Sequence, residues 1–217
     1  MKFVARGAAP NSGGDAVTQR WSDLLILEAL ALDVVRAHDI PAAPATIVET
    51  DSHRFLESER FDRIGPRGRR AVLSLAAVHD EAADSWARAA RLLRDAGRLS
   101  ADDARRLQWL DAFGALIGNT DRHHYNIVFF PETESAVLRL APAYDQASMA
   151  YAPTPDGRVP SQPITLPFAT ADTLDVWDDA QHAAREFWEQ AGDDARVSDD
   201  VRVVCAAHAR TLGQAVR

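Results

Sequence analysis

The sequence predicts a two-lobed α+β protein in which a small β-rich lobe precedes a larger, mainly helical lobe. Short apolar strands cluster near the start of the chain, helical periodicity dominates after residue 83, and one strand pair interrupts the helices. Strands and helices therefore do not alternate as they do in a parallel βαβ sheet. We place the boundary near residues 63–68, with a small lobe and hinge over 1–63 and a helical lobe over 64–217.

The first elements are predicted from apolar spacing and from turn residues. They are a strand at 2–5, a polar loop at 11–15, a helix at 17–38, and a hairpin of strands at 46–50 and 53–57. Leucine and valine recur on one face of the helix, and Pro41 marks its end. Asp51 and Ser52 separate the two strands of the hairpin and supply its turn.

The second part of the chain is predicted to be mainly helical. Helices are expected at 83–96, 100–117, 173–192 and 198–215, with strands at 127–130 and 136–140 and a proline-rich connection at 153–167. Gly97 and Gly118 are typical residues to follow a helix end. Ser100 is a good N-cap, and Asp103 stands in the capping-box position three residues later.

Composition limits the class of protein. No apolar run approaches the roughly 20 residues that a membrane span needs, and residues 1–6 lack the apolar stretch of a secretory signal. The lone Cys205 cannot form an internal disulfide. We therefore expect a cytoplasmic protein that does not bind a membrane. The formal net charge of −8 also argues against direct binding to nucleic acid.

Two features of the basic residues stand out. Lys2 is the only lysine among 24 basic side chains. Either a compact ammonium group is needed at this position, or a lysine directly after the first residue has no functional meaning. These two interpretations carry similar weight. Residues 67–70 form a compact basic run, Arg-Gly-Arg-Arg. A solvated turn is the favoured interpretation of this run, and a contact with an anion or a substrate is the alternative.

The clearest chemistry lies in the loop at 118–127 and in the later Asp145. Asp121 and Asn126 stand five residues apart in a loop that joins a helix to a strand. Phosphoryl transfer needs one carboxylate to orient the attacking hydroxyl, and oxygen ligands from an amide and a second carboxylate to hold Mg²⁺. The spacing equals that of the protein-kinase catalytic loop. Together with Asp145, it favours phosphoryl transfer over a turn with incidental polar residues.

The neighbours of Asp121 have separate expectations. His123 and His124 are adjacent, so they do not form the one-face pair of a zinc-binding helix. His123 is expected to approach the transferred phosphoryl group or to brace the loop, and His124 to be structural. Arg122 is expected to pair with an acidic neighbour rather than with phosphate.

Residues 119–126 and 140–145 resemble the catalytic and metal-binding motifs of HipA-family serine/threonine kinases, which are toxins of bacterial toxin–antitoxin systems. Residues 59–63, Glu-Arg-Phe-Asp-Arg, resemble the hinge of that family. The resemblance runs from about Arg20 to Trp188 and is closest to the YjjJ-like branch. It implies a protein-kinase-like, HipA-like fold, ATP and Mg²⁺ as cofactors, and a protein Ser/Thr hydroxyl as acceptor. The resemblance also implies a helix-turn-helix antitoxin as a possible partner.

The resemblance also assigns roles to single residues. They are Asp121 as catalytic base with His123 beside it, Asn126 and Asp145 as magnesium ligands, and Lys2, Glu59, Phe61 and Asp62 as nucleotide contacts. In this assignment Lys2 meets the phosphates, the backbone at Glu59 and Phe61 meets adenine, and Asp62 meets the ribose. Glu28 is a candidate partner for Lys2, but an exposed helix glutamate is the favoured interpretation.

Two alternatives remain open beside the protein kinase. The family carries further small-lobe sequence ahead of the lysine that Lys2 matches, including a phosphate-binding loop, so a truncated small lobe is expected here. The first alternative is therefore a truncated pseudokinase or interaction module without transfer activity. The second is a lipid or small-molecule kinase, since Asp-Arg-His-x-x-Asn is similar to the catalytic loop of phosphatidylinositol-type kinases.

Overall fold

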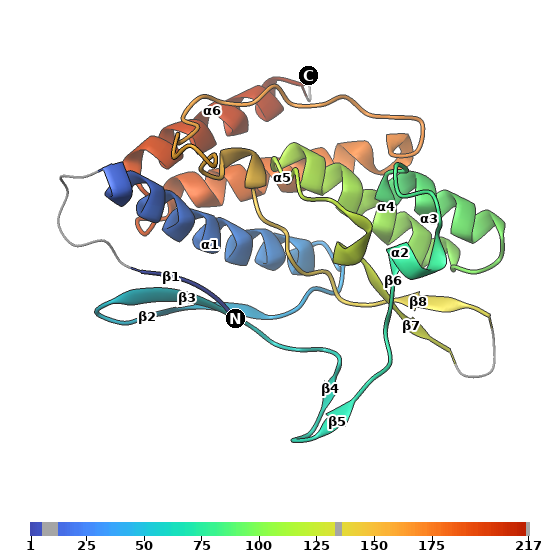
Figure 1. Ribbon diagram of the computed structural model, residues 1–217. Helices are drawn as coiled ribbons and strands as arrows, with labels where there is room; N and C mark the ends of the chain where they lie inside the picture. The colour runs from blue at the N-terminus through green and yellow to red at the C-terminus, as the bar shows by residue number, and fades with distance from the viewer. Residues whose placement is uncertain (6–12, 133–135, 216–217) are drawn as a thin grey trace.

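The computed structural model describes residues 1–5, 13–132 and 136–215, and Figure 1 shows a small sheet beneath a layer of helices. The sheet contains β1 (Lys2–Ala5), β2 (Ala45–Glu49) and β3 (His53–Ser58) in the order β1-β3-β2. Both strand pairs are antiparallel. The strand predicted at 2–5 and the hairpin predicted at 46–57 are therefore confirmed.

Helix α1 (Gly13–Ala37) lies across this sheet and joins it to the helical layer. Leu25 and Ala29 pack against Leu56 of the sheet, whereas other apolar residues of α1 belong to the main core. The helix starts earlier than predicted, so the predicted loop is wrong for residues 13–15, while residues 11 and 12 lie outside the described part. A helix held along its length by packing extends over its first turn even where the local sequence is polar and rich in glycine.

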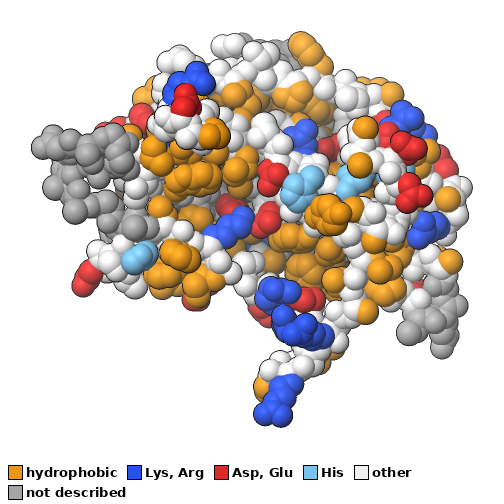
Figure 2. Space-filling view, in the orientation of Figure 1, with side chains coloured by type: hydrophobic (Ala, Val, Ile, Leu, Met, Phe, Trp, Pro, Cys, Tyr) orange, Lys and Arg blue, Asp and Glu red, His pale blue; other side chains and the backbone are white. Residues whose placement is uncertain are grey.

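A short hairpin after the hinge projects away from the rest of the molecule (Figures 1 and 2). It consists of β4 (Arg63–Ile64) and β5 (Gly68–Arg69), and all its residues are exposed. Figure 2 shows Lys and Arg side chains gathered on this projection. Residues 67–70 are exposed, as expected for the predicted solvated run, but Gly68–Arg69 form the second strand of a hairpin rather than a simple turn.

A second three-stranded sheet lies under the helices. It contains β6 (Leu73–Ser74), β7 (Val128–Pro131) and β8 (Leu138–Leu140), in the order β6-β7-β8. The strand pair β7–β8 was predicted from the sequence. Strand β6 and the one-turn helix α2 (Leu75–Val78) were not, because elements this short carry no measurable periodicity.

Four helices complete the layer: α3 (Trp86–Asp95), α4 (Ala101–Leu116), α5 (Trp177–Asp193) and α6 (Asp199–Ala215). All four were predicted, although α3 starts at Trp86 rather than at residue 83 and α5 starts at Trp177 rather than at residue 173. Ser100 caps α4 by accepting a hydrogen bond from the Asp103 amide at 3.1 Å. The Asp103 carboxylate does not complete a capping box, because it accepts a hydrogen bond from the amide of Leu140 at 2.9 Å.

The main core lies among α1, α3, α4, α5 and α6. Its largest fully buried side chains include Trp86, Phe113, Phe187 and Trp188. Aromatic side chains of this size contribute a large share of the buried apolar area. The predicted α+β class is confirmed. No helix in the described ranges is both long and apolar enough to cross a membrane.

Candidate active site

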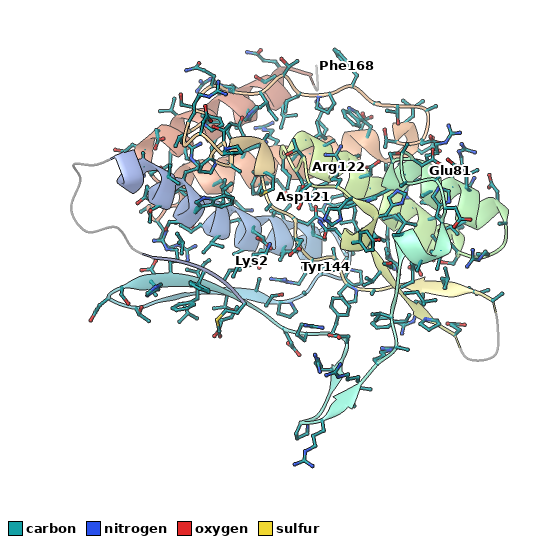
Figure 3. All side chains as sticks on the ribbon, in the orientation of Figure 1. Lys2, Glu81, Asp121, Arg122, Tyr144 and Phe168 are labelled. Atoms are coloured by element: carbon teal, nitrogen blue, oxygen red, sulfur yellow. The ribbon has the colours of Figure 1, made fainter. Side chains whose placement is uncertain are left out.

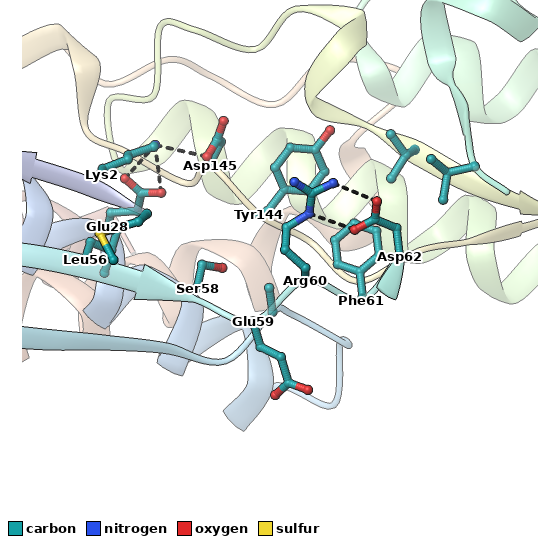
Figure 4. A pocket seen from close by; sticks show the side chains of 14 residues that line it. Lys2, Glu28, Leu56, Ser58, Glu59, Arg60, Phe61, Asp62, Tyr144 and Asp145 are labelled. Carbon is teal, nitrogen blue, oxygen red and sulfur yellow. Dashed lines mark hydrogen bonds and ion pairs between the residues drawn. The ribbon is translucent and has the colours of Figure 1, made fainter. Parts of the chain in front are cut away.

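The residues with predicted chemistry meet at the junction between the small sheet and the helical layer. Figure 3 shows Lys2, Tyr144 and Asp121 at this junction. A pocket of about 360 Å³ opens beside them (Figure 4). Its walls come from β1, the middle of α1, residues 58–62, which include most of the predicted hinge, and the loop after β8 that carries Tyr144 and Asp145.

Lys2 connects two carboxylates in this pocket. Its ammonium nitrogen lies 2.9 Å from each carboxylate oxygen of Glu28 and 2.9 Å from Oδ1 of Asp145. Glu28 is only 4% exposed, so the favoured expectation of an exposed helix glutamate was wrong. Burial of Glu28 results from β1 lying against α1, a long-range contact that helical periodicity does not reveal.

The electrostatics of this cluster favour an additional cation. Partial burial opposes the charge on Lys2, but Glu28 and Asp145 outweigh it and raise the pKa of the lysine above its usual value. Burial raises the pKa of Glu28, and the nearby Lys2 offsets only part of that effect. Two carboxylates against one ammonium leave one negative charge in excess when all three groups are ionised.

Asn119 ties the loop at residues 118–127 to the segment that carries Asp145. It is fully buried; its side-chain oxygen accepts a hydrogen bond from the Asp121 amide at 3.0 Å, and its side-chain nitrogen donates to the Asp145 carbonyl at 3.3 Å. The backbone of Asp145 has a φ of 52°, in the left-handed region that aspartate tolerates better than most residues. The Asn119 bond helps to hold this conformation.

Two further bonds complete the arrangement of these loops. The side-chain nitrogen of Asn126 donates to the Asp121 carbonyl at 2.9 Å, and the Tyr144 hydroxyl donates to the Tyr125 carbonyl at 2.6 Å. Burial and the charge of Asp145 raise the pKa of Tyr144 to about 12, so its hydroxyl stays protonated and able to donate. Asp121, Asn126 and Asp145 are thereby joined through one hydrogen-bonded network.

The carboxylate of Asp121 and the ring of His123 lie on the open side of this network. Their side chains are 55% and 49% exposed, and His123 Nε2 lies 3.6 Å from Asp121 Oδ1. Neither residue lines the enclosed part of the pocket. An exposed carboxylate on a backbone fixed by hydrogen bonds is accessible to an incoming hydroxyl group.

The same loop is braced from behind by α4 and by the segment just before α3. As predicted, Arg122 forms an ion pair, with its Nε 3.0 Å from Oδ1 of Asp111, and it also donates to the Asn119 carbonyl. His124 is buried, and its Nε2 lies 2.8 Å from the carbonyl oxygen of Asp84, which agrees with the predicted structural role. These contacts fix the loop to the helical layer.

The hinge residues are placed at the pocket, but two of them already have partners. The backbone amide of Glu59 donates to the Pro44 carbonyl at 2.9 Å. Of the two backbone groups of Glu59, the carbonyl is therefore the one left for a ligand. Both carboxylate oxygens of Asp62 accept hydrogen bonds from Arg60, at 2.7 and 2.6 Å, and these bonds lower the pKa of Asp62. Phe61 packs near Tyr144, with ring centroids 5.8 Å apart.

The donor groups suit a hard cation better than zinc. No cluster of three or more His, Cys, Asp or Glu side chains that could hold a metal ion occurs among the described residues. Asp145 and Asn126 instead offer a carboxylate and an amide oxygen. Mg²⁺ keeps several waters and needs only one or two such protein ligands, so the chemistry of these two groups suits magnesium. Asp145 lines the pocket, whereas Asn126 is buried and is not among the residues that line it.

Sequence reasoning missed two residues of this site. Glu28 was considered and set aside, and Asn119 was assigned no role. The Asn-x-Asp spacing at 119–121 is typical of an Asx turn, in which the side chain accepts from the amide two residues later, and this signal predicts the first of the two Asn119 bonds. No local signal predicts the second bond, to Asp145.

Comparisons with known proteins find similarity over most of this chain. The family model described as HipA-like C-terminal domain matches residues 1–215. Toxin YjjJ of Escherichia coli K12 is 35% identical over 191 residues, which cover 86% of this chain but 43% of that protein. The chain therefore spans less than half of this curated relative.

Two solved structures share the fold. One is a chain of the complex of HipA, HipB and operator DNA from Shewanella oneidensis MR-1, with a TM-score of 0.56, 18% identity, and coverage of 87% of this chain and 54% of that one. The other is the proinflammatory kinase CtkA of Helicobacter pylori, with a TM-score of 0.57, 10% identity, and coverage of 89% and 83%. At such identities the two structures establish a kinase-like fold and nothing further.

Proposed function

Because the chain belongs to the HipA-like C-terminal domain family, we propose that it is an ATP-dependent serine/threonine protein kinase of the HipA toxin type. In this proposal it transfers the γ-phosphate of ATP to a protein hydroxyl. The observation that carries the proposal is the network through which Asn119 joins Asp121, Asn126 and Asp145. These are the groups that phosphoryl transfer requires, and they come from separate segments of the chain.

Nucleotide binding is assigned to the pocket. Lys2, held in place by Glu28, would contact the phosphates, and the Glu59 carbonyl and the Phe61 backbone would meet adenine. Asp62 would bind the ribose only after exchanging its Arg60 partner, because both its oxygens are in use. Asp145 and Asn126 would hold Mg²⁺, which when bound neutralises phosphate charge.

Transfer is assigned to the open side of the network. Asp121 would orient the acceptor hydroxyl and accept its proton, since its carboxylate is exposed and its backbone is fixed on both sides. His123 would lie beside the transferred phosphoryl group or hold the Asp121 carboxylate in position. The protein would act in the cytoplasm, where ATP is available and the buried Cys205 stays reduced.

A helix-turn-helix antitoxin is part of the proposal. It is supported by the solved HipA structure, which is a complex with HipB and operator DNA. The second candidate function is a nucleotide-binding pseudokinase or interaction module, and the observation that favours it is that Asp121 does not line the pocket. A lipid or small-molecule acceptor would use the same loop.

The experiment separates binding from transfer. The purified chain is incubated with ATP labelled in its γ-phosphate, with proteins of a cell lysate as acceptors, and nucleotide affinity is measured separately. We expect Mg²⁺-dependent labelling of protein serine or threonine that is lost in Asp121→Asn and in Asp145→Asn. Nucleotide binding without any labelling would favour the interaction module, and labelling of lipid or of a small molecule alone would identify another acceptor.

A further inference from the structure

The β4–β5 hairpin has features that phosphate transfer does not explain. It projects from the hinge at the edge of the nucleotide pocket, and its large hydrophobic residue, Ile64, is 61% exposed. Gly68 permits the tight approach of its two strands, because a Cβ atom at this position would collide with the carbonyl oxygen of Ile64. The two strands of the hairpin can therefore pair closely while the hairpin projects from the surface.

The base of the hairpin is fixed to the body of the protein. The Arg70 amide donates to the Asp62 carbonyl at 2.8 Å, and the Arg70 guanidinium lies 3.7 Å from the centre of the Phe130 ring. A cation over an aromatic ring is stabilising when the ring is partly shielded from water, and Phe130 is buried. The projection thus has a defined orientation relative to strand β7.

The hairpin concentrates positive charge in an acidic chain. Residues 60–70 contain five arginines and one aspartate, whereas the whole chain has a net charge of −8. Most body arginines are bonded within the chain, as Arg54 is to Glu49 and Arg122 is to Asp111. In the part of the chain that the structure describes, no such partner is recorded for the guanidinium groups of Arg67 and Arg69.

A groove continues from the base of the hairpin. It has a volume of about 430 Å³, and its lining includes Arg70, Arg106 and Arg139 with the rings of Phe61 and Phe130. Asp102 and Asp103 also lie along it, and Asp103 is already bonded to Arg106 and to the Leu140 amide. The groove therefore combines arginine heads with apolar surface, as a site for an extended peptide does.

We propose that the arginine hairpin, residues 60–70, together with this groove, docks an acidic segment of a partner protein. Guanidinium groups pair with carboxylates in a two-bond geometry, and arginines that have no partner in the free protein lose no existing bond when they do so. A protein segment fits better than nucleic acid. A duplex spreads its phosphates over a wide footprint, and outside the hairpin the net charge of this chain is strongly negative.

The test uses charge reversal at the two exposed arginines without partners. The probe is a fluorescein-labelled glutamate-rich peptide, and its affinity for the full chain is compared with that for Arg67→Glu/Arg69→Glu. We expect the double variant to weaken binding by at least about tenfold and to flatten its salt dependence. The matched control is Arg158→Glu/Arg210→Glu, which changes the net charge equally at exposed sites away from the hairpin, and it should bind as the wild type does.

Three results would overturn the proposal. The first is equal weakening in both double variants, which would mean that only net charge matters. The second is unchanged affinity when the glutamates of the peptide are replaced by glutamine. The third is tighter binding of a single-stranded RNA or duplex DNA oligonucleotide than of the peptide, which would make the hairpin a nucleic-acid contact. ATP binding, measured in both double variants, shows that each remains folded.

Discussion

The ammonium nitrogen of Lys2 lies 2.9 Å from the carboxylate of Asp145, although the two residues are far apart in the sequence. The same nitrogen contacts both carboxylate oxygens of Glu28. A compact ammonium group can serve both carboxylates from one point, whereas a planar guanidinium presents its donors along fixed directions. Of the two interpretations of the single lysine, this geometry favours the one in which a compact ammonium group is needed at position 2.

The first prediction concerns the substitution Lys2→Arg. We expect weaker ATP binding and a free energy of unfolding lower by about 1–2 kcal/mol, because the larger group cannot satisfy Glu28 and Asp145 together. Calorimetric titration with ATP and urea unfolding measure the two effects. The control is Arg210→Lys at an exposed site, where the swap should be neutral. Wild-type affinity and stability in Lys2→Arg would show that any cation suffices.

The second prediction concerns Asp121→Asn. We expect transfer to fall by about 10²–10⁴-fold with ATP affinity nearly unchanged, because the carboxylate lies outside the pocket and only its backbone is bonded to Asn119 and Asn126. Single-turnover transfer and equilibrium binding are measured on the same protein. A parallel loss of affinity would instead assign this residue to nucleotide binding.

The third prediction tests Asn119 as a positioning residue. Asn119→Ala removes both bonds that join Asp121 to Asp145 and leaves the Asp121 amide and the Asp145 carbonyl, both partly buried, without these partners. We expect the free energy of unfolding to fall by about 1–3 kcal/mol and kcat to fall more than KM rises. Asn119→Asp keeps the acceptor for the Asp121 amide but loses the donor to Asp145. Intermediate kcat in Asn119→Asp is expected, and a kcat equal to the wild type in both variants would remove this role.

Sequence patterns predicted the long elements and the chemical groups, but not how those groups are held. The apolar spacing in α1 and α4–α6 is a local signal, and the helices predicted from it are confirmed. The loop spacing of Asp121 and Asn126 is also a local signal, and the roles assigned from it stay predictions. The burial of Glu28 and the Asn119–Asp145 bond depend on segments that meet only in the fold. The β4–β5 hairpin was missed because two-residue strands have no period to detect.

The fourth prediction concerns the packing behind the catalytic-loop segment. A Cβ atom at Gly114 would lie 2.9 Å from Cδ of Arg122, a side chain held by Asp111 and the Asn119 carbonyl. We therefore expect Gly114→Ala to lower the free energy of unfolding by about 1–3 kcal/mol and to reduce transfer, despite the higher helix propensity of alanine. Thermal unfolding and the transfer assay measure both.

Gly192 provides the matched control for this substitution. It lies in helix α5, and an added Cβ would come no closer than 3.6 Å to any neighbour, an ordinary van der Waals distance. Gly192→Ala should therefore raise stability by up to about 1 kcal/mol through helix propensity alone. If the two alanine variants changed stability in the same direction, the contact with Arg122 would not be the deciding factor.

The fifth prediction concerns pH and the buried His208. Its ring stacks on Trp188 with centroids 4.6 Å apart, and its Nε2 is hydrogen-bonded to the Tyr151 hydroxyl. Burial lowers the pKa of His208 from 6.5 to about 4. The unfolded chain therefore binds a proton more readily than the folded one, so this contribution to stability is complete above pH 6.5 and is lost as the pH falls toward 4. The full loss amounts to about 3 kcal/mol.

Acid-sensitive carboxylates elsewhere also change stability in this range, so the test compares pH profiles rather than single values. Urea unfolding is measured between pH 7 and pH 4.5 for the wild type and for His208→Gln, which keeps an acceptor for Tyr151 but has no proton to gain. We expect a flatter profile in His208→Gln, and a wild-type profile in the control His182→Gln, whose side chain is 64% exposed. Parallel profiles for the wild type and His208→Gln would mean that protonation of His208 does not limit the acid stability of this fold.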